Sequence, residues 1–222
     1  MPPIPQTSPR CSLYLVTPRL SAAGAGAFAR IFGETLEAAP VASALVRFAS
    51  GSEAHAEAIV TPLRGLSGRA DCALLVEGDA RAAARLGADG VHVAGVGEAL
   101  DAAIRRLKPD RIVGAGSMAT RDEAMTAGEM GADYVMFGEP REGAQETGFA
   151  SLVSLTERVA WWAEVFETPC VAFAQTIEAA GTLADAGADF VALGEAIWAS
   201  SSPASAVRDA QARIVRAGVG VP

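Results

Sequence analysis

One phrase occurs three times along this chain of 222 residues. Its copies are Gly87-Ala-Asp-Gly-Val-His-Val-Ala-Gly95, Gly131-Ala-Asp-Tyr-Val-Met-Phe-Gly-Glu139 and Gly187-Ala-Asp-Phe-Val-Ala-Leu-Gly-Glu195. Each copy follows an Ala-rich run typical of a helix and leads into a short run of β-branched or aromatic residues typical of a strand. We therefore expect each leading glycine to end a helix in the left-handed conformation, and each Gly-Ala-Asp turn to begin a strand.

The rest of the chain continues this alternation of strands and helices. Strands are predicted near residues 12–17, 41–48, 72–77, 90–94, 111–116, 133–138, 169–173 and 190–194. Short, wholly apolar strands that alternate with helices are typical of a parallel sheet covered on both faces. Eight such units predict a single (β/α)₈ TIM barrel over residues 1–222, with flexible tails at 1–10 and 218–222. An open doubly wound sheet is the alternative, although no strand is followed by the spaced glycines of a dinucleotide site.

Charge and hydropathy exclude several classes of protein. The chain has 18 Lys and Arg against 26 Asp and Glu, and this net charge of −8 argues against a nucleic-acid binder. No uncharged stretch reaches the ~20 apolar residues that cross a bilayer, so we expect no membrane span. Cys11, Cys72 and Cys170 are too few and too scattered for a disulfide framework or a metal site. We predict a cytoplasmic protein with three buried, reduced thiols and a small-molecule ligand.

Two further features concern packing. Pro62, Pro109 and Pro169 are expected in connecting segments or at a strand entrance, where a missing backbone N–H is tolerated. Trp161 and Trp162 are adjacent in a predicted helix, so one of them faces outward. An outward-facing tryptophan suggests a contact in a homo-oligomer.

In a barrel of this kind the functional site lies at the C-terminal ends of the strands, which we call the mouth. The polar residues at these ends are Thr17, Arg47, Glu77 with Asp79, His92, Ser117 with Thr120, Glu139 with Arg141, Gln175 and Glu195. Glu77, Glu139 and Glu195 each follow directly on a predicted strand, so we expect an acidic mouth. The alternative for these residues is a solvated loop position or the capping of a helix N-terminus.

The chain resembles the thiamine phosphate synthase and thiazole tautomerase family over nearly its whole length. The matching phrases are Leu13-Tyr-Leu-Val-Thr-Pro, Leu86-Gly-Ala-Asp-Gly-Val-His, Gly131-Ala-Asp-Tyr-Val-Met-Phe-Gly and Gly187-Ala-Asp with Ala196-Ile197. The resemblance implies a (β/α)₈ fold and a synthase that joins hydroxymethylpyrimidine diphosphate to a thiazole phosphate with release of pyrophosphate. It also implies Mg²⁺, which neutralises the departing diphosphate.

The same resemblance implies roles for individual residues. The expected substrate-binding residues are Arg47, His92, Ser117, Thr120, Gln175 and Gly194. Arg47 would contact the diphosphate, and His92 with Ser117 the pyrimidine. A satisfied core histidine is the alternative for His92, and helix capping is the alternative for Ser117 and Thr120.

The chain departs from the family pattern where that pattern binds anions and metal. The family has a Gln-x-Arg-x-Lys pattern on the second strand, and this chain keeps only Arg47 of it. The aspartates that bind metal in the family are also replaced here, so Asp79 or Glu77 is the remaining candidate Mg²⁺ ligand. Glu195 stands where the family has a serine. A carboxylate about 4 Å from a phosphate repels it by about 4 kcal/mol at an effective dielectric of 20. The alternative function is a divergent paralogue that binds a neutral or cationic small molecule at the acidic mouth.

Overall fold

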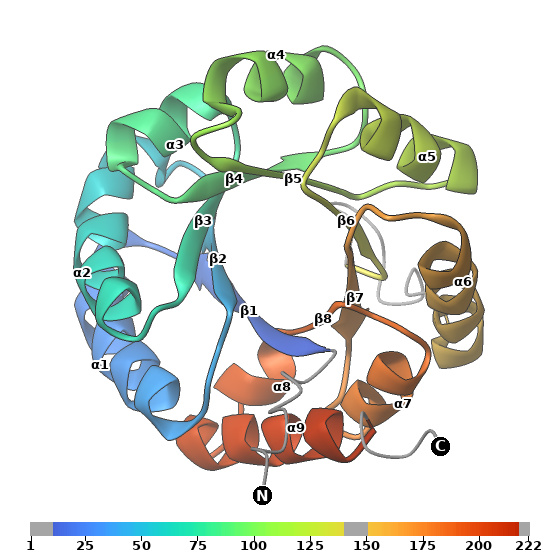
Figure 1. Cartoon of the computed structure of the whole chain (residues 1–222). Helices are drawn as coiled ribbons and strands as arrows, with labels where there is room; N and C mark the ends of the chain where they lie inside the picture. Colours follow the sequence, from blue (N-terminus) through green and yellow to red (C-terminus); the bar gives the residue numbers. More distant parts are fainter. Residues whose placement is uncertain (1–10, 140–150, 218–222) are drawn as a thin grey trace, which may run out of the picture.

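A computed structural model of the chain describes residues 11–139 and 151–217. The segments predicted to be flexible tails, 1–10 and 218–222, lie outside the described residues. Eight parallel strands form a closed barrel in sequence order, from β1 to β8 and back to β1 (Figure 1). The predicted (β/α)₈ barrel is confirmed, and the doubly wound alternative is wrong.

Strands and helices alternate along the chain. The strands are β1 (Ser12–Leu20), β2 (Ser43–Phe48), β3 (Ala73–Glu77), β4 (Gly90–Ala94), β5 (Ile112–Gly116), β6 (Tyr134–Phe137), β7 (Cys170–Ala174) and β8 (Phe190–Leu193). The helices are α1 (Ala22–Ala38), α2 (Ala56–Arg69), α3 (Ala80–Leu86), α4 (Glu98–Leu107), α5 (Arg121–Met130), α6 (Leu152–Val165), α7 (Ala179–Asp185), α8 (Glu195–Trp198) and α9 (Pro203–Ala217), with a 3₁₀ turn (Glu53–His55) before α2. Each observed strand overlaps its predicted range. Strand β1 runs on to Leu20 because an irregularity between Val16 and Arg19 extends its pairing with β2.

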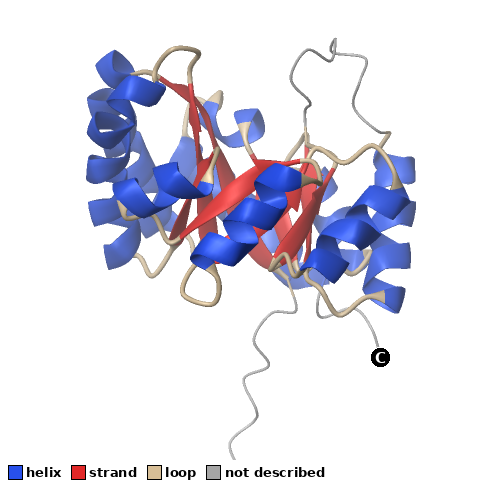
Figure 2. Cartoon of the chain, turned by 90° about the horizontal axis from the view of Figure 1, so that it is seen from above, coloured by secondary structure: helices blue, strands red, loops and turns tan. Residues whose placement is uncertain are grey.

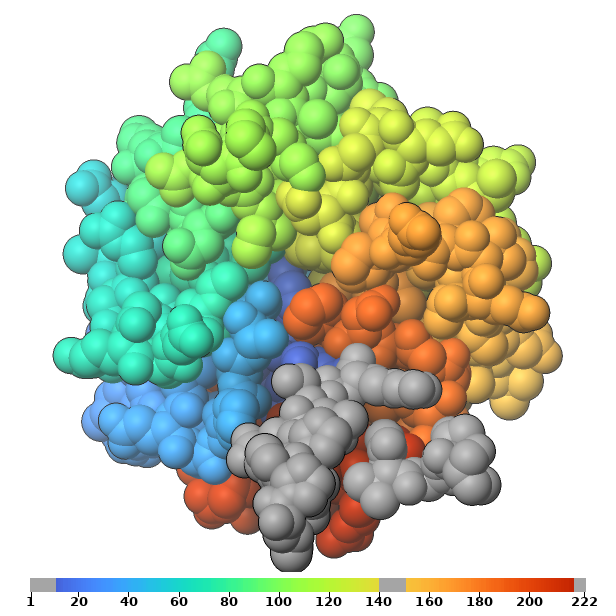
Figure 3. Space-filling model, in the orientation of Figure 1, coloured from blue at the N-terminus to red at the C-terminus, as the bar shows by residue number. Residues whose placement is uncertain are grey.

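Two apolar layers hold this barrel together. From the side, the strands lie within a jacket of helices (Figure 2), and the space-filling view shows the chain passing once around the barrel from blue to red (Figure 3). The outer layer lies between strands and helices. The inner layer fills the barrel with Tyr14, Val16, Leu45, Leu75, Tyr134, Met136, Val171, Phe173 and Ala192. Because alternate side chains of a strand point to opposite faces, each strand contributes side chains to both layers. Since the inner layer fills the barrel, a ligand must bind at one of its ends.

The aspartate of each repeated phrase joins two neighbouring strands. The Asp89 N–H donates to the Leu74 carbonyl oxygen at 2.8 Å, and an Asp89 carboxylate oxygen accepts from the Leu74 N–H at 2.7 Å. The same two bonds recur between Asp133 and Val113 and between Asp189 and Cys170. The three phrases therefore tie β3 to β4, β5 to β6, and β7 to β8 at the N-terminal end of the barrel.

The glycines of the phrase have the expected left-handed backbone. Gly87 and Gly131 are the C-caps of α3 and α5, with φ of 63° and 99°. Gly187 also has φ of 99°, but it lies one residue beyond Ala186, the C-cap of α7. A residue with a Cβ is strained at such φ values, which accounts for glycine in all three copies.

The prediction that Pro62 lies in a connection is wrong, because it lies inside α2. A proline inside a helix costs about 3 kcal/mol, since it removes one hydrogen bond and crowds the preceding turn. The neighbouring Ile59 and Leu63 are fully buried, and burying each contributes about 1.5–3 kcal/mol, which offsets that cost. Pro109 and Pro169 do precede strands β5 and β7, as predicted.

The cysteines and tryptophans are largely covered. Cys11, Cys72 and Cys170 are free and buried as expected, and burial raises the pKa of each thiol to about 12, which makes them unreactive. Trp162 is fully buried, whereas Trp161 is partly exposed beneath the Arg121 guanidinium, 4.4 Å from the ring centroid. A contact of Trp161 with a second copy stays a prediction. In the described part of the chain, no helix has the length and apolar character needed to cross a membrane.

Replacing Asp189 tests the strand-joining role of the repeated aspartates. Asp189→Ala leaves the buried Cys170 N–H without its carboxylate acceptor, so we expect the free energy of unfolding to fall by about 1–3 kcal/mol. Asp189→Asn keeps a side-chain oxygen and should recover most of this loss. Asp185→Ala, at an exposed position of α7, is the matched control in urea unfolding. Equal stability of Asp189→Ala and the control would contradict the role.

Candidate functional site

A cavity of about 360 Å³ lies at the mouth, between the ends of β1, β2, β7 and β8. Its lining residues are Val16, Thr17, Pro18, Arg47, Phe173, Ala174, Gln175, Gly194 and Glu195. Four residues predicted for the site, Arg47, Gln175, Gly194 and Glu195, are thus brought together although they lie far apart in the sequence. Its volume is at the lower end of the ~300–1,000 Å³ found for small-molecule sites.

Local structure fixes the walls of this cavity. The Thr17 hydroxyl accepts the Arg47 N–H at 3.0 Å and donates to the Pro18 carbonyl at 2.8 Å, which ties the C-terminal half of β1 to β2. Gly194 allows β8 to approach β7, because a Cβ there would lie 3.3 Å from the Phe173 ring. Glu195 follows as the exposed first residue of α8. The cavity therefore combines one guanidinium, one carboxylate and an aromatic wall.

A second polar group lies at the ends of β4, β5 and β6. His92 Nε2 lies 3.2 Å from Glu139 Oε2, and Ser117 donates both its backbone N–H and its hydroxyl, the latter at 3.0 Å, to Glu139 Oε1. The side chains of His92 and Glu139 are 4% and 13% exposed. Glu139 is therefore turned into the barrel and held by three donors, unlike a solvated loop carboxylate.

This group continues into the barrel interior. His92 Nδ1 lies 2.8 Å from the Tyr134 hydroxyl, which in turn lies 2.9 Å from the Tyr14 hydroxyl. Burial raises the pKa of both tyrosines, so both hydroxyls stay protonated. His92 is the middle residue of β4 and not at its end, and both of its ring nitrogens have partners within the protein, as its core alternative predicts.

Sequence reasoning missed the two tyrosines, and glycines on β5 are the signal that could have found them. A Cβ at Gly114 would clash with the Tyr134 ring, and a Cβ at Gly116 would clash with His92 and Glu139. Two glycines spaced by two face the same side of a strand. On an inward face they leave room for large polar side chains from the neighbouring strands.

The other predicted site residues within the described part of the chain bond to residues outside these two groups. Glu77 pairs with Arg19, with Oε2 3.2 Å from the guanidinium. Asp79 caps α3, where its Oδ1 accepts the N–H groups of Arg81 and Ala82, each at 2.8 Å.

Thr120 has the capping role that its alternative predicts. Its hydroxyl caps α5 and accepts the Glu123 N–H at 3.2 Å, while a Glu123 carboxylate oxygen accepts the Thr120 N–H at 3.1 Å. A substrate contact of Thr120 stays a prediction, and Arg141 lies outside the described residues.

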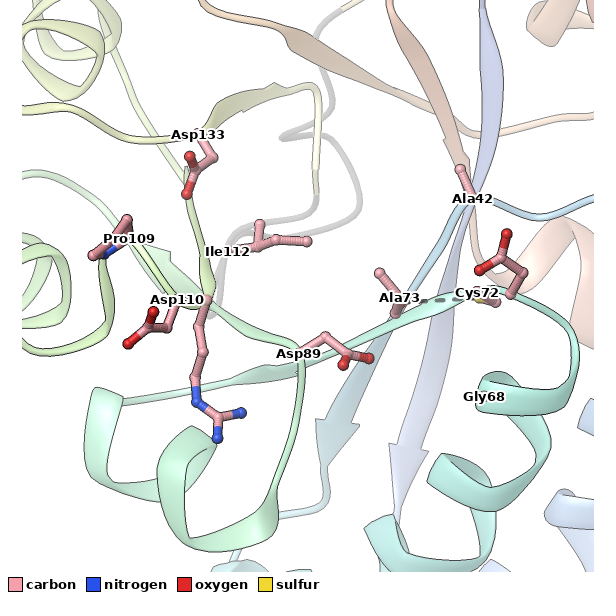
Figure 4. Close-up of a pocket in the computed structure, with 11 residues that line it drawn as sticks. Ala42, Gly68, Cys72, Ala73, Asp89, Pro109, Asp110, Ile112 and Asp133 are labelled. Atoms are coloured by element: carbon pink, nitrogen blue, oxygen red, sulfur yellow. Dashed lines mark hydrogen bonds between the residues drawn. The ribbon is translucent and has the colours of Figure 1, made fainter.

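A larger hollow of about 660 Å³ lies at the opposite end of the barrel (Figure 4). Asp71, Asp89, Asp110 and Asp133 line it together with Arg111. Two of these carboxylates accept backbone N–H groups as part of the repeated phrase. In a parallel barrel this end serves stability, so the candidate site is the mouth.

Comparison with known proteins now identifies the family. A sequence profile described as thiamine monophosphate synthase matches residues 13–197. The chain belongs to the thiamine monophosphate synthase family. A thiamine-phosphate synthase of Rhodospirillum centenum is 37% identical over 209 residues, which cover 90% of this chain and 95% of the relative. One of Hyphomonas neptunium is 35% identical over 210 residues, covering 91% and 93%.

Solved structures share the fold of this family member. A thiamine phosphate pyrophosphorylase from Pyrococcus furiosus aligns with a TM-score of 0.76 and 20% identity, covering 94% of this chain and 98% of that one. A 3-hexulose-6-phosphate synthase aligns with a TM-score of 0.70 and 19% identity, covering 91% and 99%. At these identities the likeness supports the barrel fold alone.

The described residues show no preformed site for the Mg²⁺ that family resemblance implies. Magnesium is usually held by one or two carboxylates together with substrate phosphates. Of the two candidates, Asp79 accepts two helix N–H groups and Glu77 is paired with Arg19. Residues 11–139 and 151–217 contain no cluster of three or more His, Cys, Asp or Glu side chains that could hold a metal.

The environment of Glu139 favours its ionised form. Burial alone would raise the pKa of its carboxyl group, but the electrostatic attraction of His92 and the hydrogen bonds from His92 and Ser117 outweigh burial. The pKa of Glu139 is therefore lowered from its ordinary value of 4.5. A carboxyl with a lowered folded-state pKa stabilises the fold above its unfolded pKa, and this stabilisation is lost as the pH falls.

The stability of Glu139→Gln should therefore depend on pH differently from that of the parent protein. Near neutral pH we expect the variant to be less stable by about 1–3 kcal/mol, because hydrogen bonds to a charged acceptor are lost. The difference should shrink once the pH falls below the unfolded value of 4.5. Urea unfolding over this pH range, with Glu129→Gln on the exposed face of α5 as the charge control, measures it. A difference that is constant with pH would contradict the assignment.

Proposed function

We propose that this protein joins hydroxymethylpyrimidine diphosphate to a thiazole phosphate and releases pyrophosphate, as a thiamine phosphate synthase. The observation that carries the proposal is the extent of the match to curated synthases, which spans about nine tenths of this chain and more than nine tenths of the relatives. The position of the cavity supports it, because ligands of such barrels bind at the C-terminal ends of the strands. The free, buried cysteines agree with a cytoplasmic enzyme.

The cavity offers two contacts suited to this reaction. The departing pyrophosphate gains negative charge, and a fixed cation that faces it lowers the barrier. Arg47 is the positively charged side chain of the described lining, and its backbone is held by Thr17. Phe173 supplies an apolar face for a heteroaromatic ring.

Arg47 gives the direct test of the proposed synthase. The purified protein, supplied with both precursors and magnesium, is expected to form thiamine phosphate, measured by chromatography. Arg47→Ala should lower kcat/KM by about tenfold or more, since a charged contact contributes about 1.5–3 kcal/mol. Arg69→Ala, at an exposed position of α2, is the control. Absence of product from folded parent protein would contradict the proposal.

Glu195 favours a second candidate function. Its carboxylate lines the cavity where the family places a serine near phosphate, and no second cation is part of the described lining. A carboxylate at this place repels a phosphate and attracts positive charge. The second candidate is a paralogue that binds a neutral or cationic heterocycle without catalysing the condensation.

The affinity for thiazole phosphate separates the two candidates. If Glu195 repels the ligand, Glu195→Ser should bind thiazole phosphate at least about tenfold more tightly than the parent, because removing a repulsion of about 1.4 kcal/mol or more has that effect. Isothermal titration measures the affinity, and Glu129→Gln controls for net charge. Tight binding by the parent, unchanged in Glu195→Ser, would contradict the second candidate and support the synthase.

A further inference from the structure

Four buried or nearly buried side chains form one chain of hydrogen bonds from the barrel interior to the mouth. It runs from the Tyr14 hydroxyl to the Tyr134 hydroxyl, then to His92 Nδ1, and from His92 Nε2 to the Glu139 carboxylate. We propose that His92 is a positioning residue, fixed as its Nε2–H tautomer, that holds the Glu139 carboxylate at the mouth. Glu139, and not His92, then meets the ligand on this side of the barrel.

Glu139 determines which atom donates and which accepts in each of these hydrogen bonds. An ionised carboxylate can only accept hydrogen bonds. Its Oε1 accepts the N–H and the hydroxyl of Ser117, and its Oε2 lies 3.2 Å from His92 Nε2. A bond at that distance requires a proton on Nε2.

When the imidazole is neutral, the remaining groups then have one consistent arrangement. With its proton on Nε2, a neutral imidazole accepts at Nδ1, so the Tyr134 hydroxyl donates to it and accepts from the Tyr14 hydroxyl. In the opposite arrangement Nδ1–H donates to Tyr134 and Tyr134 to Tyr14. The lone pairs of Nε2 and Glu139 would then face each other, and in the described part of the chain the Tyr14 hydroxyl has no acceptor besides Tyr134.

Packing keeps the imidazole in this place. The His92 and Tyr134 rings are stacked, with centroids 5.7 Å apart and planes 18° from parallel. The ring also lies against Gly116, where a Cβ would clash with it. Both ring nitrogens are therefore used within the protein, and His92 has no polar atom left for a ligand.

The contact that remains for a ligand comes from Glu139. Its Oε2 accepts one hydrogen bond from His92, so it retains a lone pair, and the side chain keeps 13% of its surface exposed. A carboxylate with a free lone pair suits an N–H donor and repels phosphate. This step rests on the proposed function, under which the donor is the amino group of the pyrimidine.

Nitrogen NMR of the two histidines tests the tautomer directly. The chain contains only His55 and His92, so labelling histidine with ¹⁵N gives two imidazoles, and His55→Gln assigns them. At mildly alkaline pH we expect Nε2 of His92 to carry the proton and Nδ1 to carry none. An Nδ1–H tautomer, or an even mixture of the two, would overturn the proposal.

Two variants test the two ends of the hydrogen-bonded series, Glu139 and Tyr14, separately. In Glu139→Gln the amide N–H can point at Nε2, so we expect the proton to move to Nδ1. Tyr14→Phe is the matched control, because it leaves the Tyr134 to His92 bond in place and should leave the tautomer unchanged. A tautomer that Glu139→Gln does not change would contradict control by Glu139.

The kinetic consequence is tested separately. If Glu139 accepts the pyrimidine amine, Glu139→Gln should raise KM for the pyrimidine diphosphate about tenfold with a smaller change in kcat, since one charged hydrogen bond is lost. An unchanged KM would contradict the ligand contact. Absence of condensation in the parent would contradict the proposed function instead, and the NMR result would still decide the positioning role.

Discussion

The paired hydrogen bonds of Asp89, Asp133 and Asp189 are the constraint on which the barrel depends most. Each aspartate accepts the N–H of a residue on the preceding strand and donates its own N–H to the carbonyl of that same residue. One residue thus sets the register of two strands. Because a slip of one residue would turn every side chain to the other face, this register also decides which residues point into the barrel.

The inward face of β5 shows how register leads to the site. Gly114 and Gly116 face the interior, and the space they leave is filled by Tyr134, His92 and Glu139 from the neighbouring strands. Such polar groups are tolerated in a barrel interior only when they are hydrogen-bonded. The result is a mouth with two unlike sides, an internally bonded carboxylate at β4 to β6 and an open cavity at β7 to β2.

The repeated phrase and the apolar runs sufficed to predict the barrel, because helix C-caps and buried parallel strands are local patterns. They failed at Pro62, where packing of Ile59 and Leu63 outweighs the local preference against proline in a helix. At the mouth, the sequence predicted which residues lie at strand ends but not their partners. The pairing of Glu139 with His92 joins residues 47 apart in the chain, and no local pattern encodes it.

The three glutamates predicted at the mouth have different environments in the structure. Glu77 is matched by Arg19, and Glu139 is held by His92 and Ser117. Only Glu195, of the three glutamates predicted there, lines the cavity, where Arg47 stands as the opposite charge. The mouth is thus no general acidic surface, and within the cavity the preference between phosphate and a cationic ligand depends on the balance between one guanidinium and one carboxylate.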